Sequence, residues 1–281
     1  MSLLKKIIKV IQNHIFDLIS QTKSSKFRSL FNFYIRVMTK NNFNLRCELH
    51  KSLYKFNDST GEIFLTQPKR SAYLLGSIEH RLNKLFEEYM LHDVNFEDND
   101  IVVDCGANIG ELYLSIKKRE NNNFNYYGYE PSEKDFRALK LNTNNLVKSN
   151  YALFEREENK VIYLNEENAD NSLSLIDNVT SEDEIQAIPL DKVKELENKK
   201  IKLLKLEAEG DELSVLKGAK NILKNIKFIS ADLGFEKYDA DNENYISTLA
   251  PVAKYLNNHN FELINTYRLT RKTFLFENKK I

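Results

Sequence analysis

Hydrophobic and polar positions follow two different rhythms along this chain of 281 residues, and the change falls near residue 99. Before it, apolar residues recur at helical spacing in residues 3–19 and 77–91, and residues 61–66 alternate as a strand does. After it, short apolar runs alternate with amphipathic segments, which is typical of an open parallel sheet covered by helices. We therefore predict a basic, helical N-terminal extension over residues 1–70 and an α/β domain over residues 71–281.

The second rhythm predicts a specific series of elements. The strands are expected at residues 101–103, 125–129, 150–154, 161–164, 201–206, 228–233, 261–267 and 273–276. The helices are expected at residues 110–118, 132–141, 211–223 and 245–257. A polar stretch at residues 165–184 is predicted to be a long loop, and long loops in compact domains are often functional.

The first predicted helix is amphipathic, and its apolar positions share one face: Leu3, Leu4, Ile7, Ile8, Ile11, Ile15 and Leu18. Lysines and other polar residues occupy the opposite face. We favour a helix that packs on its own protein. Peripheral attachment of residues 3–19 to an anionic membrane is an alternative, as is docking on a partner. No apolar run reaches the roughly 20 residues that a membrane span needs.

Charge is divided unevenly along the chain. Lys plus Arg and Asp plus Glu each total 41, so the formal net charge is zero. Residues 1–70 nevertheless hold 13 basic and 4 acidic residues. Aromatic and basic residues interleave between Phe27 and Arg36, which we interpret as a helix core face with solvated charges rather than a nucleic-acid site. Overall neutrality also argues against a nucleic-acid partner.

The cysteines and histidines give no sign of a disulfide framework or a zinc site. Cys47 and Cys105 are the two cysteines, and the five histidines are scattered without a metal-binding spacing. A reducing cytoplasm is therefore the expected compartment, with the inner face of the membrane as the peripheral alternative. Richness in Asn, Lys and Ile suggests an AT-rich bacterial genome.

The most informative stretch follows the first strand of the α/β part. Asp104 ends that strand and Gly106 to Gly110 form a turn into a helix. In open α/β sheets, ligands bind at the carboxyl ends of strands, and a glycine lets a ligand approach the backbone. The turn lacks the three glycines of a dinucleotide site, and a second acid, Glu130, ends the next strand. This pattern suits the ribose of a nucleoside without a pyrophosphate, such as S-adenosylmethionine.

These motifs together resemble the FkbM family of S-adenosylmethionine-dependent methyltransferases. The first signature is Asp104-Cys105-Gly106-Ala107-Asn108-Ile109-Gly110, followed by Tyr129-Glu130-Pro131. The second is Leu190-Asp191, then Leu204-Lys205-Leu206-Glu207-Ala208-Glu209-Gly210-Asp211-Glu212, then Val215-Leu216-Lys217-Gly218-Ala219. The resemblance runs from about residue 99 to the C-terminus and departs at two positions. Glu207 stands where the family usually has Asp, and Asp232 where it usually has Glu.

The resemblance implies a fold, a cofactor and a set of binding residues. The fold is the class I methyltransferase form of a Rossmann-like open sheet, with seven mostly parallel strands, an antiparallel last strand and helices on both faces. The cofactor is S-adenosylmethionine. Its expected binding residues are Asp104, Gly106, Ala107, Asn108, Gly110, Glu130 and Pro131.

Catalytic candidates lie at the ends of the fourth and fifth main strands. Lys205, Glu207 and Glu209 alternate onto one face, where a class I methyltransferase places its acceptor. We predict Glu207 as the general base, Asp232 as second choice, and Lys205 as a residue that pairs with a carboxylate or orients the acceptor. A structural ion pair between Lys205 and Glu207 is the alternative. Carboxylates such as Glu207, Asp232 and Glu236 could hold Mg²⁺, but nothing in their spacing demands it, so we predict no metal.

The predicted activity is O-methylation of a hydroxyl on a sugar, glycan or small molecule, in glycan or natural-product assembly. The turn after the fourth strand lacks the aromatic clamp for a flipped base that DNA methyltransferases carry, which disfavours nucleic acid. Asp170-Asn171-Ser172 in the polar loop could bind a carbohydrate. The alternatives are a non-catalytic or membrane-docked binding module and, less favoured, a nicotinamide-dependent oxidoreductase. The sequence does not specify the acceptor or the oligomeric state.

Overall fold

The computed structural model describes residues 3–39, 44–120, 122–146, 149–164, 181–239, 244–267 and 272–281. The chain forms two compact units, Met1–Arg81 and Leu82–Ile281. The domain boundary that we predict after residue 70 lies inside the first unit. The reason is that the 3-10 helix at Lys69–Leu74 and the start of the helix at Ile78 group with the preceding segments.

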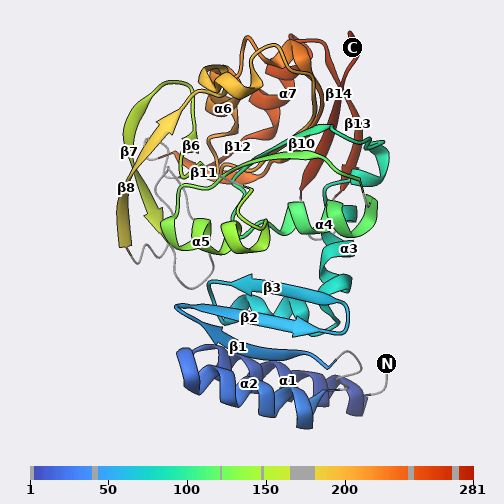
Figure 1. Ribbon diagram of the computed structural model, residues 1–281, viewed down its shortest axis with the longest axis vertical. Coiled ribbons are helices and arrows are strands. Elements are labelled where there is room, and N and C mark those ends of the chain that lie inside the picture. The colour runs from blue at the N-terminus through green and yellow to red at the C-terminus, as the bar shows by residue number, and fades with distance from the viewer. Residues whose placement is uncertain are drawn as a thin grey trace. The chain divides into compact units, whose positions relative to one another are not determined.

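The first unit combines two helices with a small sheet (Figure 1). Its elements are α1 (Leu3–Ser20), α2 (Ser24–Met38), β1 (Arg46–His50), β2 (Leu53–Asp58), β3 (Gly61–Leu65) and the 3-10 helix η1 (Lys69–Leu74), followed by the start of α3 (Ile78–Glu88). The strands are antiparallel in the order β1-β2-β3. We predict a helical extension here, and the structure adds a three-stranded antiparallel sheet to its helices.

Aromatic side chains form the core of this unit. Phe27 and Phe31 of α2 are fully buried and pack against Phe56 of β2, with ring centroids 6.5 and 5.2 Å from it. Tyr54 lies 5.2 Å from Phe27. The aromatic residues that we assigned to a helix core face are thus largely in the core, except Phe33, whose side chain is 64% exposed.

The first helix packs through one edge of its apolar stripe. Phe16 and Ile19 are buried, whereas Ile7, Ile11 and Leu18 are exposed. The difference arises because α1 meets α2 mainly through the side that carries Phe16, which leaves most of the isoleucine stripe exposed. Within the described residues, α1 and the other helices are too short or too polar to span a membrane.

The second unit is an α/β domain. Its strands are β4 (Ile101–Cys105), β5 (Asn125–Tyr129), β6 (Ala152–Leu153), β7 (Glu158–Leu164), β8 (Ser181–Ile188), β9 (Ile201–Leu206), β10 (Ile226–Asp232), β11 (Phe235–Asp239), β12 (Asn244–Ser247), β13 (Phe261–Tyr267) and β14 (Thr273–Asn278). Its helices, besides the rest of α3, are α4 (Glu111–Glu120), α5 (Glu133–Asn142), α6 (Glu212–Gly218) and α7 (Leu249–Asn257). Short 3-10 helices are η2 (Leu91–Asp93), η3 (Leu190–Lys192), η4 (Lys194–Leu196) and η5 (Leu223–Asn225).

The main sheet confirms the predicted fold class. Its order is β13-β14-β10-β9-β4-β5, with β10, β9, β4 and β5 parallel and the final strand β14 antiparallel to β10. The described residues place six strands in it rather than seven. The expected seventh strand, at residues 150–154, pairs in β6 with β8 in a separate sheet and reaches the main sheet only through a bridge between Tyr129 and Ser149.

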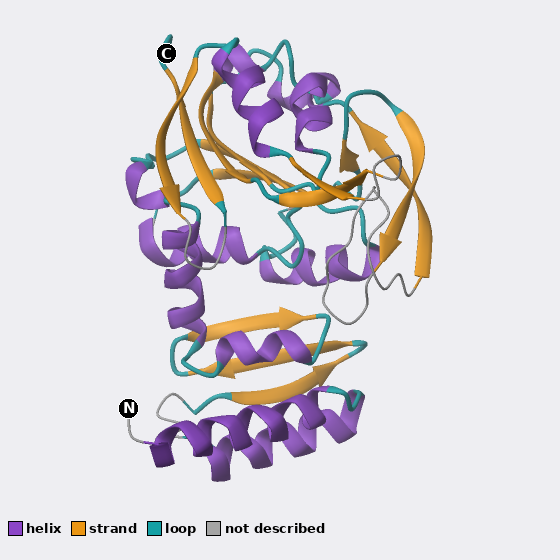
Figure 2. Ribbon diagram, turned by 180° about the vertical axis from the view of Figure 1, so that it is seen from behind, coloured by secondary structure: helices purple, strands orange, loops and turns teal. Residues whose placement is uncertain are grey.

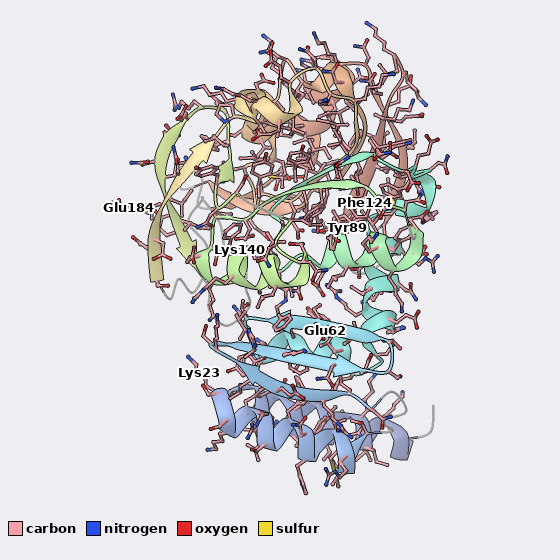
Figure 3. The ribbon with its side chains drawn as sticks, in the orientation of Figure 1. Lys23, Glu62, Tyr89, Phe124, Lys140 and Glu184 are labelled. Atoms are coloured by element: carbon pink, nitrogen blue, oxygen red, sulfur yellow. The ribbon has the colours of Figure 1, made fainter. Side chains whose placement is uncertain are left out.

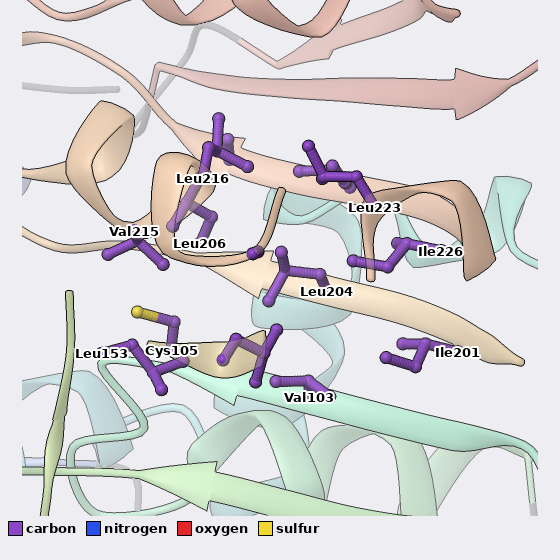
Figure 4. Packing of buried hydrophobic residues seen from close by; sticks show 14 of the residues in the cluster. Val103, Cys105, Leu153, Ile201, Leu204, Leu206, Val215, Leu216, Leu223 and Ile226 are labelled. Carbon is purple, nitrogen blue, oxygen red and sulfur yellow. The ribbon is translucent and has the colours of Figure 1, made fainter. Parts of the chain in front are cut away.

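Helices cover both faces of the main sheet (Figures 1 and 2). On one face, Val103 of β4 and Leu204 of β9 pack with Val215 of α6 and Leu256 of α7 in a buried cluster (Figure 4). On the other, Val102 and Leu203 pack with residues of α3, α4 and α5. Because side chains alternate along a strand, Asp104 and Lys205 share the face of Val102 and Leu203.

Three element predictions differ from the structure. The helix expected over residues 211–223 ends at Gly218, because the carboxylate of Asp191 accepts the backbone N–H groups of Asn221 and Ile222 at 3.0–3.1 Å. Residues 245–247, expected to begin a helix, belong to β12 (Asn244–Ser247), which pairs with β11. Residues 181–184 of the expected loop belong to β8, and Asp170-Asn171-Ser172 lie outside the described residues.

Candidate active site

The candidate site lies at the carboxyl ends of β4, β5, β9 and β10, where open α/β sheets bind ligands. The turn after β4 is fixed to the end of β5, since the N–H groups of Gly106 and Ala107 both donate to the carbonyl of Tyr129, at 3.1 and 2.9 Å. Asn108 follows with a positive φ of 48°. The turn thus has one defined shape before the first turn of α4.

Two glycines in this turn are required by geometry. Gly106 has a φ of +71°, and a Cβ there would lie 2.1 Å from the carbonyl oxygen of Glu207. Gly110 has a φ of +87°, and its Cβ would lie 2.8 Å from Leu139 of α5. Gly106 therefore lets the β4 turn and the end of β9 approach each other, while Gly110 lets the turn pack against α5.

A buried ion pair joins β4 and β9 beneath the turn. Asp104 and Lys205 are cross-strand partners in the sheet register, and Lys205 Nζ lies 3.2 Å from Asp104 Oδ1. The hydroxyl of Tyr126, from β5, donates to the other carboxylate oxygen of Asp104. Burial raises the pKa of Asp104, and Lys205 opposes that effect. Asp104 is buried, and its carboxylate contacts Lys205 and Tyr126.

Lys205 connects this pair to the glycine turn and to Glu207. Its ammonium donates to the carbonyl oxygens of Cys105 and Gly106, at 3.1 and 2.6 Å, and lies 3.1 Å from Glu207 Oε2. Burial alone would lower the pKa of Lys205, but Asp104, Tyr89 and Glu207 outweigh it, and the pKa is raised well above its usual value. Lys205 therefore stays charged and holds the turn in place.

Glu207 is the partly accessible carboxylate of this group. Its side chain is 23% exposed, while that of Lys205 is 4% exposed. The phenol of Tyr89, just after α3 and labelled in Figure 3, donates to Glu207 Oε2. The backbone carbonyl of Tyr89 accepts from Ser230 Oγ of β10 at 2.8 Å. Tyr89 and Lys205 thus fix one carboxylate oxygen of Glu207 from two sides.

Glu130 lies beside the turn at the end of β5. Its two carboxylate oxygens accept the backbone N–H groups of Asn108 and Ser132, each at 2.8 Å. The residue is 4% exposed. Burial, reinforced by the nearby Asp135, raises the pKa of Glu130 to about 8. Each oxygen keeps a further lone pair, so the carboxylate can also accept hydroxyl hydrogen bonds.

The loop from β9 to α6 is held by its own helix. Glu212, in the first turn of α6, accepts the N–H groups of Ala208 and Gly210 through Oε1 at 2.9 and 3.1 Å. Burial raises the pKa of Glu212. Glu209 has a positive φ of 46°, an unusual conformation for a glutamate. The Glu209-Gly210 turn expected from the sequence is thus a constrained loop beyond the end of β9.

The remaining predicted residues are placed as follows. Ala107 is buried and Pro131, after Glu130, is half-buried. Asp232 ends β10 and accepts the N–H of Lys272 at 3.2 Å through Oδ1. The side chain of Glu236 lies outside the described residues. Among the side chains that are described, no three His, Cys, Asp or Glu residues form a group that could hold a metal ion.

The structure thus brings Asp104, Lys205 and Glu207 into direct contact, with Glu130 across the glycine turn. Two tyrosines that contact this group are not among the predicted site residues. Tyr126 lies in the strand predicted at residues 125–129, and its spacing from Gly128 and Glu130 places it on the same face of that strand. Tyr89 lies in the helical pattern of residues 77–91, and its contact with Glu207 joins residues 118 positions apart.

Comparison with known proteins supplies the family. The family model described as "Methyltransferase FkbM domain" matches residues 104–263. Together with the glycine turn at the end of the first strand of a mostly parallel sheet, this defines the protein as a methyltransferase of the open α/β class. The chain belongs to the FkbM methyltransferase family, whose methyl donor is S-adenosylmethionine. A search of curated proteins gives no match.

Several solved methyltransferase structures are similar at low identity. The FkbM methyltransferase of Methylobacillus flagellatus KT is 16% identical, covers 95% of this chain and 59% of its own, and has a TM-score of 0.47. TrmK of M. capricolum with S-adenosylhomocysteine is 12% identical, covers 71% and 68%, and scores 0.38. The N-terminal domain of human METTL16 with SAH is 15% identical, covers 88% and 82%, and scores 0.37. The chain thus spans 59% of the length of the Methylobacillus protein.

The residues of the site fit S-adenosylmethionine. Glu130 lies beside the glycine turn, where its carboxylate can accept the two ribose hydroxyls. With Lys205 charged and Asp104 and Glu207 as carboxylates, the group would carry net negative charge, which suits a sulfonium, and loss of the Glu130 proton would add to that charge. When bound, the cofactor supplies an electrophilic methyl group. The chain's own residues would supply its orientation and the acceptor's proton transfer.

Proposed function

We propose that this protein transfers the methyl group of S-adenosylmethionine to a hydroxyl oxygen of a sugar, glycan or small-molecule acceptor. The observation that carries the proposal is the placement of Glu207. Its partly exposed carboxylate lies at the carboxyl end of β9, beside the glycine turn and held by Lys205 and Tyr89. Such a carboxylate can accept a proton from a hydroxyl whose oxygen attacks a methyl group in line.

In the proposed reaction Glu207 is the general base. A hydroxyl acceptor would lose its proton to Glu207 as its oxygen forms a bond to the methyl carbon. The bond between that carbon and the sulfonium sulfur would break, with the neutral thioether as leaving group. Lys205 is a positioning residue, because its contacts with the carbonyls of Cys105 and Gly106 leave it holding the turn rather than the acceptor. Asp232 is the second candidate base, at the end of the neighbouring strand β10.

The acceptor class follows from what surrounds the base. The turn Glu207-Ala208-Glu209-Gly210 carries no aromatic side chain on which a flipped base could stack, which favours a hydroxyl acceptor over a nucleobase. Its carboxylates are suited to accept hydrogen bonds from the several hydroxyls of a sugar. We therefore rank glycans and small polyhydroxylated molecules above nucleic acids as acceptors. The cytoplasm is the proposed site of action, because both cysteines are free thiols.

The test is methyl transfer from radiolabelled S-adenosylmethionine to a panel of acceptors. The panel contains free and nucleotide-linked sugars, small phenols and alcohols, transfer RNA and single-stranded DNA. We expect label in an alkali-stable ether on a sugar or small molecule. Label only in RNA or DNA would contradict the acceptor, and binding of NAD in place of S-adenosylmethionine would contradict the reaction.

The base is tested separately by Glu207→Gln, with Asp232→Asn as the matched comparison. If Glu207 is the base, Glu207→Gln lowers kcat by about 10²–10⁴-fold, the usual contribution of general base catalysis, while Asp232→Asn has a much smaller effect. S-Adenosylmethionine affinity, measured by calorimetry, should change little in either variant. The opposite order of effects on kcat would make Asp232 the base.

A further inference from the structure

The two helices of the first unit meet along one line and leave apolar rows beside it. Phe16 of α1 packs against Tyr34 and Phe31 of α2, with ring centroids 5.8 and 6.5 Å apart. The hydroxyl of Tyr34 donates to the carbonyl of Gln12 at 3.3 Å. Figures 1 and 2 show α1 and α2 side by side as one layer.

The position of the sheet fixes which side of α2 faces outward. The side chain of Asn32 bonds both backbone groups of Cys47 in β1, at 2.8 and 2.9 Å. At 100° per residue, Leu30, Phe33 and Val37 form a row on the opposite flank of α2. All three are exposed, Phe33 by 64% and Val37 by 58%. This row therefore points away from the sheet.

A second row continues the same surface on α1. Ile7, Ile11 and Leu18 lie one to two turns apart on one side of α1 and are exposed. Ile15 and the buried Ile19 lie between this row and Phe16, the residue at the contact with α2. The two rows therefore flank the line along which the helices touch. Together they form a single exposed aliphatic face, much larger than isolated surface side chains account for.

Basic residues border this face. Lys26 and Arg36 are exposed and lie within or beside the row on α2, at helical spacing from Phe33. Residues 6–39 contain six Lys and Arg residues and one acid, Asp17. Long basic side chains can place their charges at lipid headgroups while their stems lie along apolar surface. Aliphatic rows with lysine and arginine beside them, as on α2, are typical of helices that lie in a membrane interface.

We propose that the outer face of α1 and α2 docks on an anionic lipid surface. A second copy of the chain fits less well, because a symmetric contact would bring two positively charged faces together. Single-stranded nucleic acid fits less well, because stacking needs aromatic rings and Phe33 is the single exposed aromatic side chain within the described part of α1 and α2. Anionic headgroups satisfy the basic rim and acyl chains satisfy the aliphatic rows. This inference does not depend on the chemistry of the active site.

The experiment is flotation of the full-length protein with phospholipid vesicles. One set contains phosphatidylcholine alone and the other about one third phosphatidylglycerol, an anionic fraction sufficient to attract basic segments. We expect binding to the anionic vesicles, weakened by salt. Phe33→Glu and Ile11→Glu should each lower the partition coefficient by about tenfold, since a buried apolar contact is replaced by a charge that the lipid repels.

The matched control is Leu263→Glu, because Leu263 lies in the second unit and is 49% exposed, as against 50% for Ile11. It should bind vesicles as the parent does. Circular dichroism and S-adenosylmethionine binding should be unchanged in all variants. Equal binding by the parent and Phe33→Glu would overturn the proposal. So would a dimer, measured by light scattering, that Phe33→Glu dissociates, or RNA binding with no affinity for anionic vesicles.

Discussion

At the scale of single residues, the site depends on a small number of side chains that each have a defined partner. Glu207 has Tyr89 and Lys205, Asp104 has Lys205 and Tyr126, and Glu130 has two backbone N–H groups. Each of these bonds can be removed by a substitution that keeps the shape of the side chain, such as Tyr to Phe or Glu to Gln. The consequences for binding, for catalysis and for stability should therefore be separable.

The phenol of Tyr89 is expected to position the base. Tyr89→Phe removes its hydrogen bond to Glu207 Oε2 and leaves the ring in place, so Glu207 gains rotational freedom. Hydrogen bonds to charged groups contribute roughly 1.5–3 kcal/mol, and we expect kcat to fall by about tenfold or more. Steady-state kinetics should show an unchanged KM for S-adenosylmethionine. Tyr255→Phe, which loses a weaker bond to Leu216 of 3.5 Å, should leave kcat unaltered.

Glu130 is expected to release a proton when the cofactor binds. Its pKa of about 8 keeps it largely protonated at pH 7, whereas two ribose hydroxyls would favour the carboxylate. Calorimetry in buffers of different ionisation enthalpy should therefore detect proton release below pH 8 and little above it. Glu130→Gln should abolish this release and weaken binding. Proton release that persists in Glu130→Gln would assign it to another group.

The same pKa fixes the sign of a stability effect. In the unfolded chain Glu130 has an ordinary pKa near 4. Between that value and about 8 the folded protein holds a proton that the unfolded chain does not. The contribution of Glu130 to the free energy of unfolding is therefore fully present at acid pH and declines as pH rises to about 8. Glu130→Gln should remove this decline in urea titrations across that range.

Gly106 is expected to tolerate no side chain. Gly106→Ala places a Cβ 2.1 Å from the carbonyl of Glu207 and forces alanine into the left-handed region, which by itself costs about 1–2 kcal/mol. We expect a loss of at least about 2 kcal/mol in the free energy of unfolding, together with loss of cofactor binding. Gly61→Ala is the control, because its Cβ would meet only Ile78 at 3.9 Å. A Gly106→Ala protein as stable as Gly61→Ala would contradict the close approach of the two strands.

At the scale of elements, side-chain to backbone bonds decide where helices end. Asp191, from the Leu-Asp pair of the second signature, belongs to the 3-10 helix η3 and accepts the N–H groups of Asn221 and Ile222 after α6. The signature residue therefore has a structural role here, since it ends α6 and joins it to the segment before β9. A motif match alone does not distinguish this role from catalysis.

Asp191→Ala is expected to destabilise the second unit. Two backbone N–H groups would lose a charged acceptor, which costs about 1–3 kcal/mol. The free energy of unfolding from urea titrations measures the effect, and S-adenosylmethionine affinity should remain near that of the parent. Asp183→Ala, an exposed position in β8, is the comparison and should be close to neutral. Equal stability of the two variants would show that the Asp191 contacts contribute nothing.

At the scale of the whole molecule, each compact unit contains one cysteine. Cys47 lies in β1 of the first unit and Cys105 in β4 of the second, and both are buried with free thiols. Burial raises the pKa of Cys47 to about 12 and that of Cys105 further still. Thiols react as thiolates, so both should be inert in the folded protein.

The thiols are therefore expected to report unfolding. With an excess of a thiol reagent at pH 8, the native protein should remain unlabelled over hours, and both cysteines should react at once in concentrated urea. Mass spectrometry of the labelled peptides identifies each site. Cofactor should slow labelling of Cys105 further, since it stabilises the folded second unit. Fast labelling of either cysteine in the native protein would contradict its burial.

The division of the chain into two units also explains the net charge of zero. The basic excess of residues 1–70 lies within the first unit, where Lys26 and Arg36 border the exposed face of α1 and α2. The acidic residues of the site belong to the second unit. The net charge of zero thus combines a basic surface, which suits anionic lipid, with an acidic site, which suits a cationic cofactor.

Sequence alone determined the order and type of most elements of the second unit, because local periodicity and glycine turns fix those. Short apolar runs predict the strands β4, β5 and β9. A glycine, which has few steric restrictions on its backbone, predicts the turn at Gly106. The class of fold and the family followed from the same motifs. The amphipathic character of α1 was equally local.

Only the tertiary structure decided which of these residues touch. Asp104 and Lys205 meet because β4 and β9 are neighbours in the sheet, although 100 residues of chain separate them, and Tyr89 reaches Glu207 from outside the family signatures. Within the described residues, the pairing of β6 with β8 instead of the main sheet and the exposed stripe of α1 were also decided by neighbouring segments. Such contacts depend on packing between distant segments, which no local pattern encodes.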